Sequence, residues 1–114
     1  MSYINSLGVN TSTRKMTTRQ QISDVFSYGY IITTKSRGKL TQRYLERMIT
    51  LSKRGTLADR RRVASVILRT SKYEKDQLLN KIFTDIAKKY KDRNGGCTRL
   101  LKLQEKDRVV LSLV

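Results

Sequence analysis

The fold depends most on residues 93–102, which read Arg-Asn-Gly-Gly-Cys-Thr-Arg-Leu-Leu-Lys. The chain passes here from a helical pattern to a strand pattern. Gly95 or Gly96 can close the preceding helix and turn the chain back, because glycine takes positive φ without a Cβ clash. The same segment combines cations with apolar leucines. We therefore expect it to pack into a core and to present charge to a partner, which suits an RNA-packing protein better than an enzyme.

Two strands are predicted after the glycines, from Cys97 to Gln104 and from Arg108 to Val114, joined by the polar turn Glu105-Lys106-Asp107. Val109, Leu111 and Leu113 alternate with Arg108, Val110 and Ser112, so one face of the second strand is apolar. This face should pack against the helices. An isolated hairpin is only marginally stable. We therefore expect Tyr30–Thr34, which is aromatic and β-branched, to join it in a three-stranded sheet.

Four helices are predicted from apolar residues that recur at helical spacing. The first runs from Thr13 to Ser27 and the second from Ser36 to Lys53. The third begins at Thr56, where an acidic residue three positions later resembles a capping box, and extends to Arg69. The fourth contains an apolar stripe from Leu79 to Tyr90. The expected core positions of the first, second and fourth helices are Met16, Ile22, Val25 and Phe26; Leu40, Tyr44, Leu45, Met48, Ile49 and Leu51; Leu79, Ile82, Phe83, Ile86 and Tyr90.

These elements predict an α+β fold, with about four helices packed on a small three-stranded sheet that includes a C-terminal β-hairpin. A chain of 114 residues fits one domain, which we place at residues 14–114. Residues 1–13 carry no side-chain charge and show no sustained period, so we interpret them as an extended N-terminal arm. A frayed terminus that contributes little is the alternative.

Charge dominates the composition, with 25 lysines and arginines against 9 acidic residues, a formal net charge of +16. Such a surplus destabilises a compact monomer through self-repulsion, whereas a polyanion turns each cation into an attraction that releases counterions. Nucleic acid is therefore the expected partner. No apolar run is long enough to span a membrane and no signal peptide is recognisable, so we expect no membrane partner.

The residues that catalysis and metal binding use most often are scarce. The single cysteine, Cys97, cannot form an intramolecular disulfide, and no histidine is present to complete a metal cluster or to transfer protons near neutral pH. The acidic residues form no close pair in a predicted cleft. We expect a reducing compartment and no enzyme activity, cofactor, metal site or small-molecule substrate.

Two arginine clusters stand out on the predicted helices. Arg43, Arg47 and Arg54 form a narrow stripe opposite the core face of the second helix, where RNA contact competes with a solvated surface as the interpretation. Residues 60–62 are consecutive arginines in the first turn of the third helix, where the macrodipole already places positive charge. An anion such as phosphate is expected to compensate them.

For Arg60 an alternative stays open, in which its stem packs beside Leu57, Ala64 and Ile67 while its charged head remains in water. Asp59 offsets part of the arginine charge. Arg14, Lys15 and Arg19 add positive charge at the opening of the first helix.

Three blocks of sequence resemble the bacterial large-subunit ribosomal protein seventeen family. The first is Ile32-Thr33-Thr34 followed by Lys39 and Arg43. The second is residues 49–55, Ile-Thr-Leu-Ser-Lys-Arg-Gly, continuing to Leu57 and Arg60-Arg61. The third is residues 93–102, after a helix that contains Lys81-Ile82-Phe83. Each block alone is a weak signal, but their order and spacing over most of residues 14–104 are specific.

The resemblance implies a structural constituent of the large ribosomal subunit that binds large-subunit ribosomal RNA near the polypeptide exit region. It implies other large-subunit proteins as neighbours, a cytoplasmic location in the ribosome, and no catalysis. The matched positions that we expect to contact RNA are Thr33, Thr34, Lys39, Arg43, Arg60, Arg61, Arg93, Thr98, Arg99 and Lys102. From the charge pattern we add Arg14, Arg19, Arg47 and Arg62.

The chain departs from the family pattern in three places. Relatives usually begin with a basic, histidine-containing arm, whereas residues 1–13 are uncharged here. Cys97 stands where relatives commonly carry tyrosine, so any stacking there is lost or replaced by a smaller packing group. The turn at Glu105-Lys106-Asp107 lacks the usual arginine- and glycine-rich loop, so contacts from that loop are not expected here.

Two other classes of function compete with this interpretation. The helix ending at Arg54, the Gly55 turn and the helix from Thr56 to Arg69 resemble a helix-turn-helix in outline, which makes a DNA-binding regulator the alternative. A ribonuclease is the third class, but the sequence lacks the histidines, paired carboxylates and metal cluster that such chemistry uses.

Overall fold

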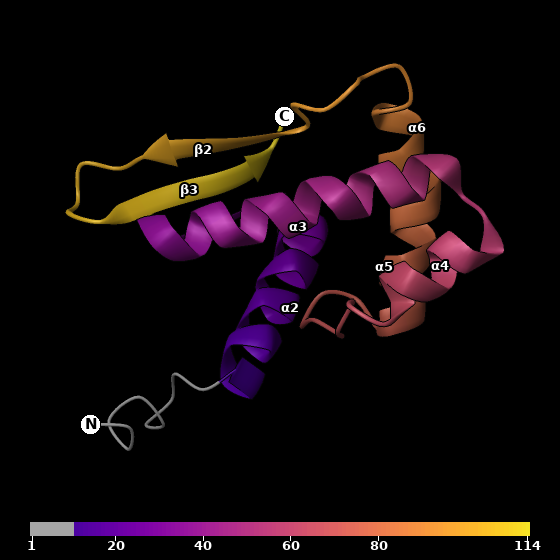
Figure 1. The fold of residues 1–114 in the computed structure, drawn as a ribbon, viewed down its shortest axis with the longest axis horizontal. Helices are drawn as coiled ribbons and strands as arrows, with labels where there is room; N and C mark the ends of the chain where they lie inside the picture. The colour runs from indigo at the N-terminus through magenta and orange to yellow at the C-terminus, as the bar shows by residue number, and fades with distance from the viewer. Residues whose placement is uncertain (1–10) are drawn as a thin grey trace.

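The computed structural model describes residues 11–114, with the backbone alone at residues 11 and 12. Figure 1 shows a long helix, α3, with the sheet along one side and the other helices at its far end and beneath it. The elements in chain order are α2 (Thr11–Tyr28), β1 (Tyr30–Thr34), α3 (Lys35–Arg54), α4 (Leu57–Ala64), α5 (Lys75–Lys81), the π-helical turn η1 (Ile82–Ile86), α6 (Ala87–Lys89), β2 (Thr98–Lys102) and β3 (Arg108–Leu113).

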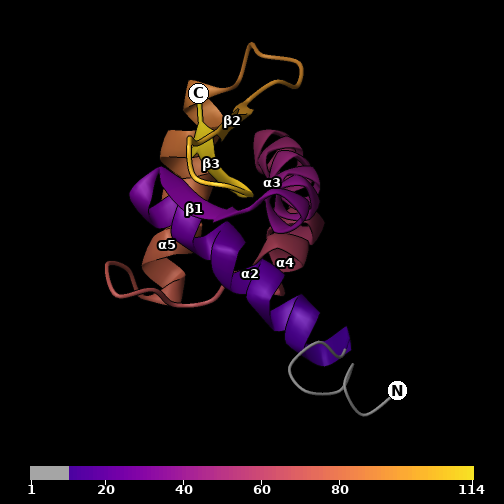
Figure 2. The ribbon, with the colours of Figure 1, turned by 90° about the vertical axis from the view of Figure 1, so that its left-hand side faces the viewer.

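The three strands form one antiparallel sheet in the order β1-β3-β2, so the α+β prediction is confirmed. The C-terminal strand lies in the middle, with Tyr30 opposite Ser112 on one side and Thr98 opposite Leu113 on the other. Leu111 is fully buried beneath the helices. The central position of β3 therefore joins β1, from the first third of the chain, to β2, near its C-terminus (Figure 2).

Helix α3 supplies the middle of the core through Leu45, Met48 and Ile49, as predicted. The helix ends at Gly55, whose φ of +67° lets its N–H reach the carbonyl of Leu51. Tyr44 was predicted to be a core residue, but its side chain is 49% exposed. One residue along a helix turns the side chain by about 100°, so with Leu45 at the centre of the buried face Tyr44 falls on its edge.

The third helix is shorter than predicted, because α4 ends at Ala64 instead of continuing to Arg69. The following backbone is bonded to α2: the N–H of Leu68 donates to Ser23 Oγ at 2.8 Å, and Arg19 Nε donates to the carbonyl of Val66 at 3.1 Å. Partners on another element thus replace the hydrogen bonds that a longer helix would have made.

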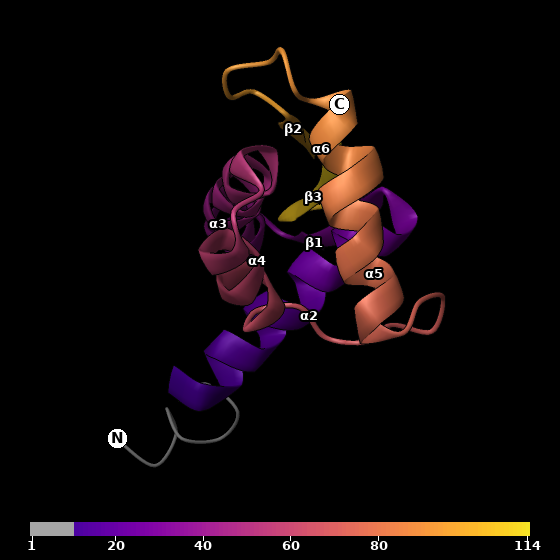
Figure 3. The ribbon, with the colours of Figure 1, turned by 90° about the vertical axis from the view of Figure 1, so that its right-hand side faces the viewer.

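The fourth predicted helix is present as a continuous helical segment made of α5, η1 and α6 (Figure 3). Its buried stripe contains Leu79, Ile82, Ile86 and Tyr90, and the prediction holds at these positions. Phe83 is only half-buried. Sequence periodicity missed the π-helical turn, and it misplaced Met16 of α2, which is 50% exposed rather than buried.

Gly95 and Gly96 both take positive φ, +73° and +63°, as expected for a turn. They do not close the helix, because α6 ends at Lys89 with Tyr90 at its C-cap position, several residues earlier. Lys53 at the end of α3 donates to the carbonyl of Arg93 and so attaches this turn to the long helix. The Tyr90 hydroxyl donates to the Val114 carbonyl at 2.7 Å. The segment between α6 and β2 is thus tied to both α3 and the end of the sheet.

The predicted N-terminal arm falls mostly outside the described residues, and Thr11 to Thr13 already belong to α2 instead. Within residues 11–114, no helix combines the length and the apolar character that crossing a membrane requires.

Candidate nucleic-acid interface

The described residues contain all 25 lysines and arginines and all 9 acidic residues of the chain. Among these residues the structure forms one ion pair, between Arg54 and Asp59. The positive charge is therefore not cancelled inside the folded protein. Most of it lies on exposed side chains, available to an anionic partner.

Helices α2 and α3 bring several of the predicted RNA contacts together. A hollow of about 350 Å³, here called the α2–α3 cleft, lies between α2 and α3. A second hollow, here called the arginine groove, adjoins it and is lined by Leu40, Arg43, Tyr44 and Arg47. The residues that line the α2–α3 cleft are Arg14, Lys15, Thr18, Arg19, Ile22, Leu40, Tyr44 and Val66.

Both hollows are walled by Leu40 and Tyr44, so they are neighbours. Arg14, Arg43 and Arg47 are exposed, as is Lys39 one turn before Arg43. None of the described residues that line either hollow is acidic. Helix crossing thus gathers cations from two segments into one surface, which the linear sequence could not show.

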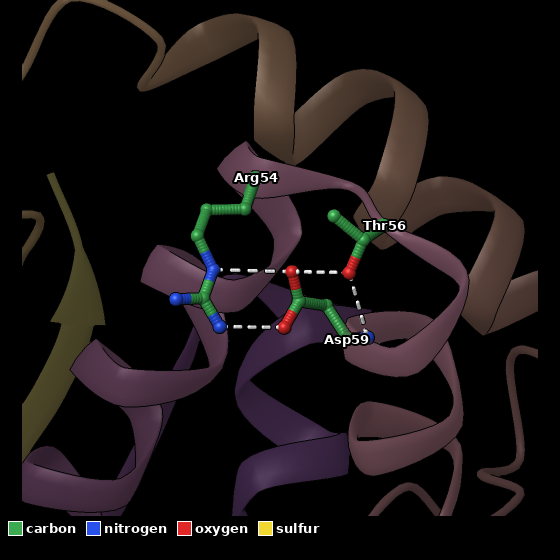
Figure 4. Close-up of polar contacts among 3 residues, drawn as sticks. All are labelled: Arg54, Thr56 and Asp59. Atoms are coloured by element: carbon green, nitrogen blue, oxygen red, sulfur yellow. Dashed lines mark hydrogen bonds and ion pairs between the residues drawn. The ribbon is translucent and has the colours of Figure 1, made fainter.

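Arg54 differs from the rest of its predicted stripe because it is committed to a partner within the protein (Figure 4). Its Nη2 lies 2.6 Å from Asp59 Oδ1 and its Nε lies 3.1 Å from Oδ2. Thr56 Oγ1 donates to the same Oδ2 at 2.8 Å and accepts from the Asp59 N–H at 3.1 Å, the predicted N-cap. Hydrogen bonds from Arg54 and then from Thr56 lower the pKa of Asp59 to about 2.

The consecutive arginines of α4 have different surroundings. The Asp59 carboxylate bonds to Arg54 and Thr56 rather than to these arginines. Arg60 Nη2 donates to Asn80 Oδ1 at 2.8 Å, and the guanidinium carbon of Arg60 lies 5.4 Å from the centre of the Phe83 ring. This cation–π contact holds α4 against α5 and η1, and it differs from the alternative of packing beside Leu57. Arg61 and Arg62 are exposed.

Two threonines among the predicted RNA contacts are buried and bonded inside the protein. Thr33 Oγ1 accepts from Gln21 Nε2 at 2.9 Å. The Thr98 hydroxyl donates to Glu46 Oε1 at 2.8 Å and accepts from Gln42 Nε2 at 3.1 Å. These hydroxyls fix the sheet to the helices. Thr34, by contrast, is half-buried and forms the N-cap position of α3 without a side-chain capping bond.

The hairpin turn forms a further basic region that the sequence alone did not reveal. Pairing of Thr34 with Arg108 brings the start of α3 to the end of the hairpin. A third hollow lies at the hairpin turn, and Lys102, a predicted RNA contact, lines it. The structure adds further exposed cations to this hollow. The added cations are Lys35, Lys106 and Arg108, and the acidic Glu105 and Asp107 line the same hollow.

The remaining predicted contacts lie apart from the α2–α3 cleft. Arg93 is exposed in the glycine turn, and Arg99 is exposed on β2. Cys97, between them, is 1% exposed, and burial followed by the charge of Glu46 raises the pKa of its thiol. The described residues contain no group of histidine, cysteine and acidic side chains that could hold a metal ion.

Comparisons with known proteins agree on one family. The family model described as "Ribosomal protein L17" matches residues 17–113. Large ribosomal subunit protein bL17 of Malacoplasma penetrans is 52% identical over 103 residues, which are 90% of this chain and 87% of the relative. The proteins of the same name from Ureaplasma parvum and Mycoplasma genitalium are 48% and 47% identical over 90% of this chain, covering 87% and 84% of their own lengths.

Proposed function

This chain belongs to the ribosomal protein L17 family, and from that premise we propose that it holds large-subunit ribosomal RNA through lysine and arginine contacts to phosphates. Its role is that of a structural, non-enzymatic component of the large ribosomal subunit. The prediction that the chain is not an enzyme is thereby confirmed. The observation that carries the proposed RNA contact is the arrangement of lysines and arginines of α2 and α3 around two adjoining hollows. Among the residues that the structure describes, none of the cations lining these hollows forms an ion pair, and no acidic residue lines either hollow.

The mechanism is electrostatic assembly on a rigid scaffold. Each phosphate that a lysine or arginine neutralises releases condensed counterions, which drives binding without base readout. The core, to which α2, α3, the sheet and the α5–α6 segment all contribute, fixes the distances between cations. Fixed spacing lets the protein hold RNA segments at set positions relative to one another, which suits a packing role.

The finer assignments follow from the family resemblance. On that basis we propose a position near the polypeptide exit region, beside other large-subunit proteins, in ribosomes of the cytoplasm. Within this proposal the contacts are made by the exposed cations of the cleft, the α4 arginines, the glycine turn and β2. Thr33 and Thr98 act as supports for this surface, because their hydroxyls are used internally.

The DNA-binding alternative has little support from the geometry. The helix after the Gly55 turn contains only Leu57–Ala64, and its arginines include Arg60, which is bonded to Asn80. A helix-turn-helix regulator would present a recognition helix to the major groove and would usually dimerise to match paired half-sites.

Co-sedimentation of the purified chain with large subunits depleted of this protein tests the proposal, with small subunits and duplex DNA as controls. We expect stoichiometric binding to the large subunit alone. The affinity for large-subunit RNA should fall by roughly three to five decades between low and moderate salt if about six to ten phosphates are contacted. Equal binding to small subunits, or a salt slope of one or two phosphates, would contradict it.

A further inference from the structure

We propose that the α2–α3 cleft receives one unstacked RNA base, while the cations around it bind the flanking phosphates. This inference rests on the proposed function, because it adds a base site to a surface otherwise described by phosphate contacts. It names the part of the RNA that the cleft takes: an unpaired nucleotide in a bulge, loop or junction. Sequence-specific or structure-specific RNA recognition commonly targets such splayed nucleotides.

The cleft has the size and lining of a small-ligand site. Its volume of about 350 Å³ lies at the lower end of the roughly 300–1,000 Å³ range of such pockets. Its apolar surface comes from Ile22 on α2, Leu40 and Tyr44 on α3, and Val66 in the segment after α4. A planar, largely apolar group fits this lining better than a hydrated phosphate does.

Tyr44 provides the stacking group. Its side chain is 49% exposed, although Leu45, the next residue in the helix, and Met48, one turn later, are buried in the core. A tyrosine ring at the wall of an apolar hollow can stack on the face of any base, so the site needs no particular sequence. Because α3 is packed along its length, the ring is held on a rigid element.

The charged rim supplies the second half of the site. Arg14 and Lys15 line the α2–α3 cleft on the α2 side, and Arg43 and Arg47 line the arginine groove beyond Tyr44. A base placed against Tyr44 would therefore have its two neighbouring phosphates between cations from different helices. Arg19 is bonded through Nε to the Val66 carbonyl, so it serves as a fixed wall.

Charge complementarity decides between the possible occupants. An apolar peptide would fill the floor of the cleft but would leave the rim cations unpaired, and an uninterrupted RNA duplex would satisfy the rim without supplying a base for the floor. A single unpaired nucleotide offers an aromatic base with a phosphate on either side. It is the occupant that matches both parts of the surface.

The test uses two RNA hairpins that differ by one unpaired 2-aminopurine bulged from the stem. Stacking quenches this fluorescent base, so the signal reports its environment as well as binding. With the full chain we expect quenching and an affinity roughly tenfold higher for the bulged hairpin than for the continuous one. Tyr44→Ala should abolish both effects, whereas Tyr44→Phe should keep them because the ring remains.

Tyr28→Ala is the matched control, since Tyr28 is another helical tyrosine with 44% exposure but lies outside both hollows. It should leave the bulge preference unchanged. Equal affinity for the two hairpins, or a bulge preference that survives Tyr44→Ala in a variant with wild-type thermal unfolding, would overturn the base site. Binding of the continuous hairpin with a steep salt slope would still support the proposed function, whereas failure to bind either hairpin would overturn both.

Discussion

Arg54 and Asp59 face each other across the Gly55 turn in a two-pronged ion pair, with contacts of 2.6 and 3.1 Å. The Asp59 side chain is 2% exposed, whereas that of Arg54 is 58% exposed. The carboxylate also receives the Thr56 hydroxyl, so one acidic group fixes both the end of α3 and the start of α4. The direction of α4, and with it the position of the exposed Arg61 and Arg62, therefore depends on Asp59 remaining ionised.

Acid should weaken the fold at this turn. The pKa of Asp59 is lowered from 3.8 to about 2, so the folded chain binds its proton less readily than the unfolded chain does. The stabilisation is fully present above about pH 4 and is lost as the pH falls through about 2. Asp59→Asn should lower the free energy of unfolding at neutral pH, and this deficit should shrink as the pH falls from 4 to about 2, as measured by urea unfolding.

Asp92→Asn is the control, because Asp92 is exposed and lies outside the turn. It corrects for the general effect of removing an acidic group from a strongly basic protein. A deficit for Asp59→Asn that stays constant between neutral pH and pH 2 would show that the carboxylate charge does not stabilise the turn.

Removing two adjacent cations from the arginine groove should reduce RNA binding in a way that salt reveals. Arg43→Gln combined with Arg47→Gln removes two exposed charges without touching the buried core. If both contact phosphate, the slope of log affinity against log salt for ribosomal RNA should decrease by about two, and binding should weaken uniformly across sequences. Filter binding at several salt concentrations measures both quantities.

The matched control for that pair is Lys75→Gln with Lys88→Gln. It removes the same charge from exposed positions on the α5–α6 segment, away from both hollows. Equal losses of slope for the two double variants would indicate diffuse attraction to the net charge rather than contact at the groove.

The architecture was largely predictable, because it rests on local signals. The aromatic and β-branched residues of Tyr30–Thr34 predicted β1 with its observed bounds. The paired glycines marked the change from helix to strand, and the alternation from Val109 to Leu113 identified the face of β3 that packs on the helices. The misses depend on tertiary contacts. Only the bonds from α2 to the backbone of residues 66–68 explain why α4 ends early.

The candidate site was less predictable than the fold. Charge indicated which residue types would face a polyanionic partner, but not which of them meet in space. Nothing local in the sequence indicates that Arg14 and Tyr44 line one cleft, or that the hydroxyl of Thr98 is spent on Glu46. Tyr44 itself was assigned to the core, because a helical period cannot resolve residues at the edge of the buried face.

The thiol of Cys97 should react slowly with disulfide reagents in the native protein. Its side chain is 1% exposed, and burial raises its pKa above the ordinary value of 9.0, so the thiolate is scarce at neutral pH. Reaction with a chromogenic disulfide reagent should be far slower in native buffer than in concentrated urea. Glu46→Ala should speed the native reaction, because it removes both a nearby negative charge and the partner of the Thr98 N–H. Native and unfolded rates that were equal would contradict the buried environment.

The close approach of α3 to the sheet should make Gly38 intolerant of larger side chains. A Cβ at this position would lie 2.8 Å from Val109 Cγ2 and 2.9 Å from Leu100 Cδ1, shorter than any ordinary carbon–carbon contact. Val109 is 2% exposed and cannot yield freely. Gly38→Val should therefore lower the free energy of unfolding by about 1–3 kcal/mol through overpacking, measured by urea titration.

The control for Gly38→Val is Ser36→Val, which places the same β-branched residue at an exposed position in the same turn of α3. It should cost only the small difference in helix propensity, about 0.5 kcal/mol or less. Because the sheet fixes the direction of α3, and α3 holds Arg43 and Arg47, Gly38→Val should also weaken RNA binding whereas Ser36→Val should not. Equal stability of the two variants would mean that the sheet can move away from α3 at little cost.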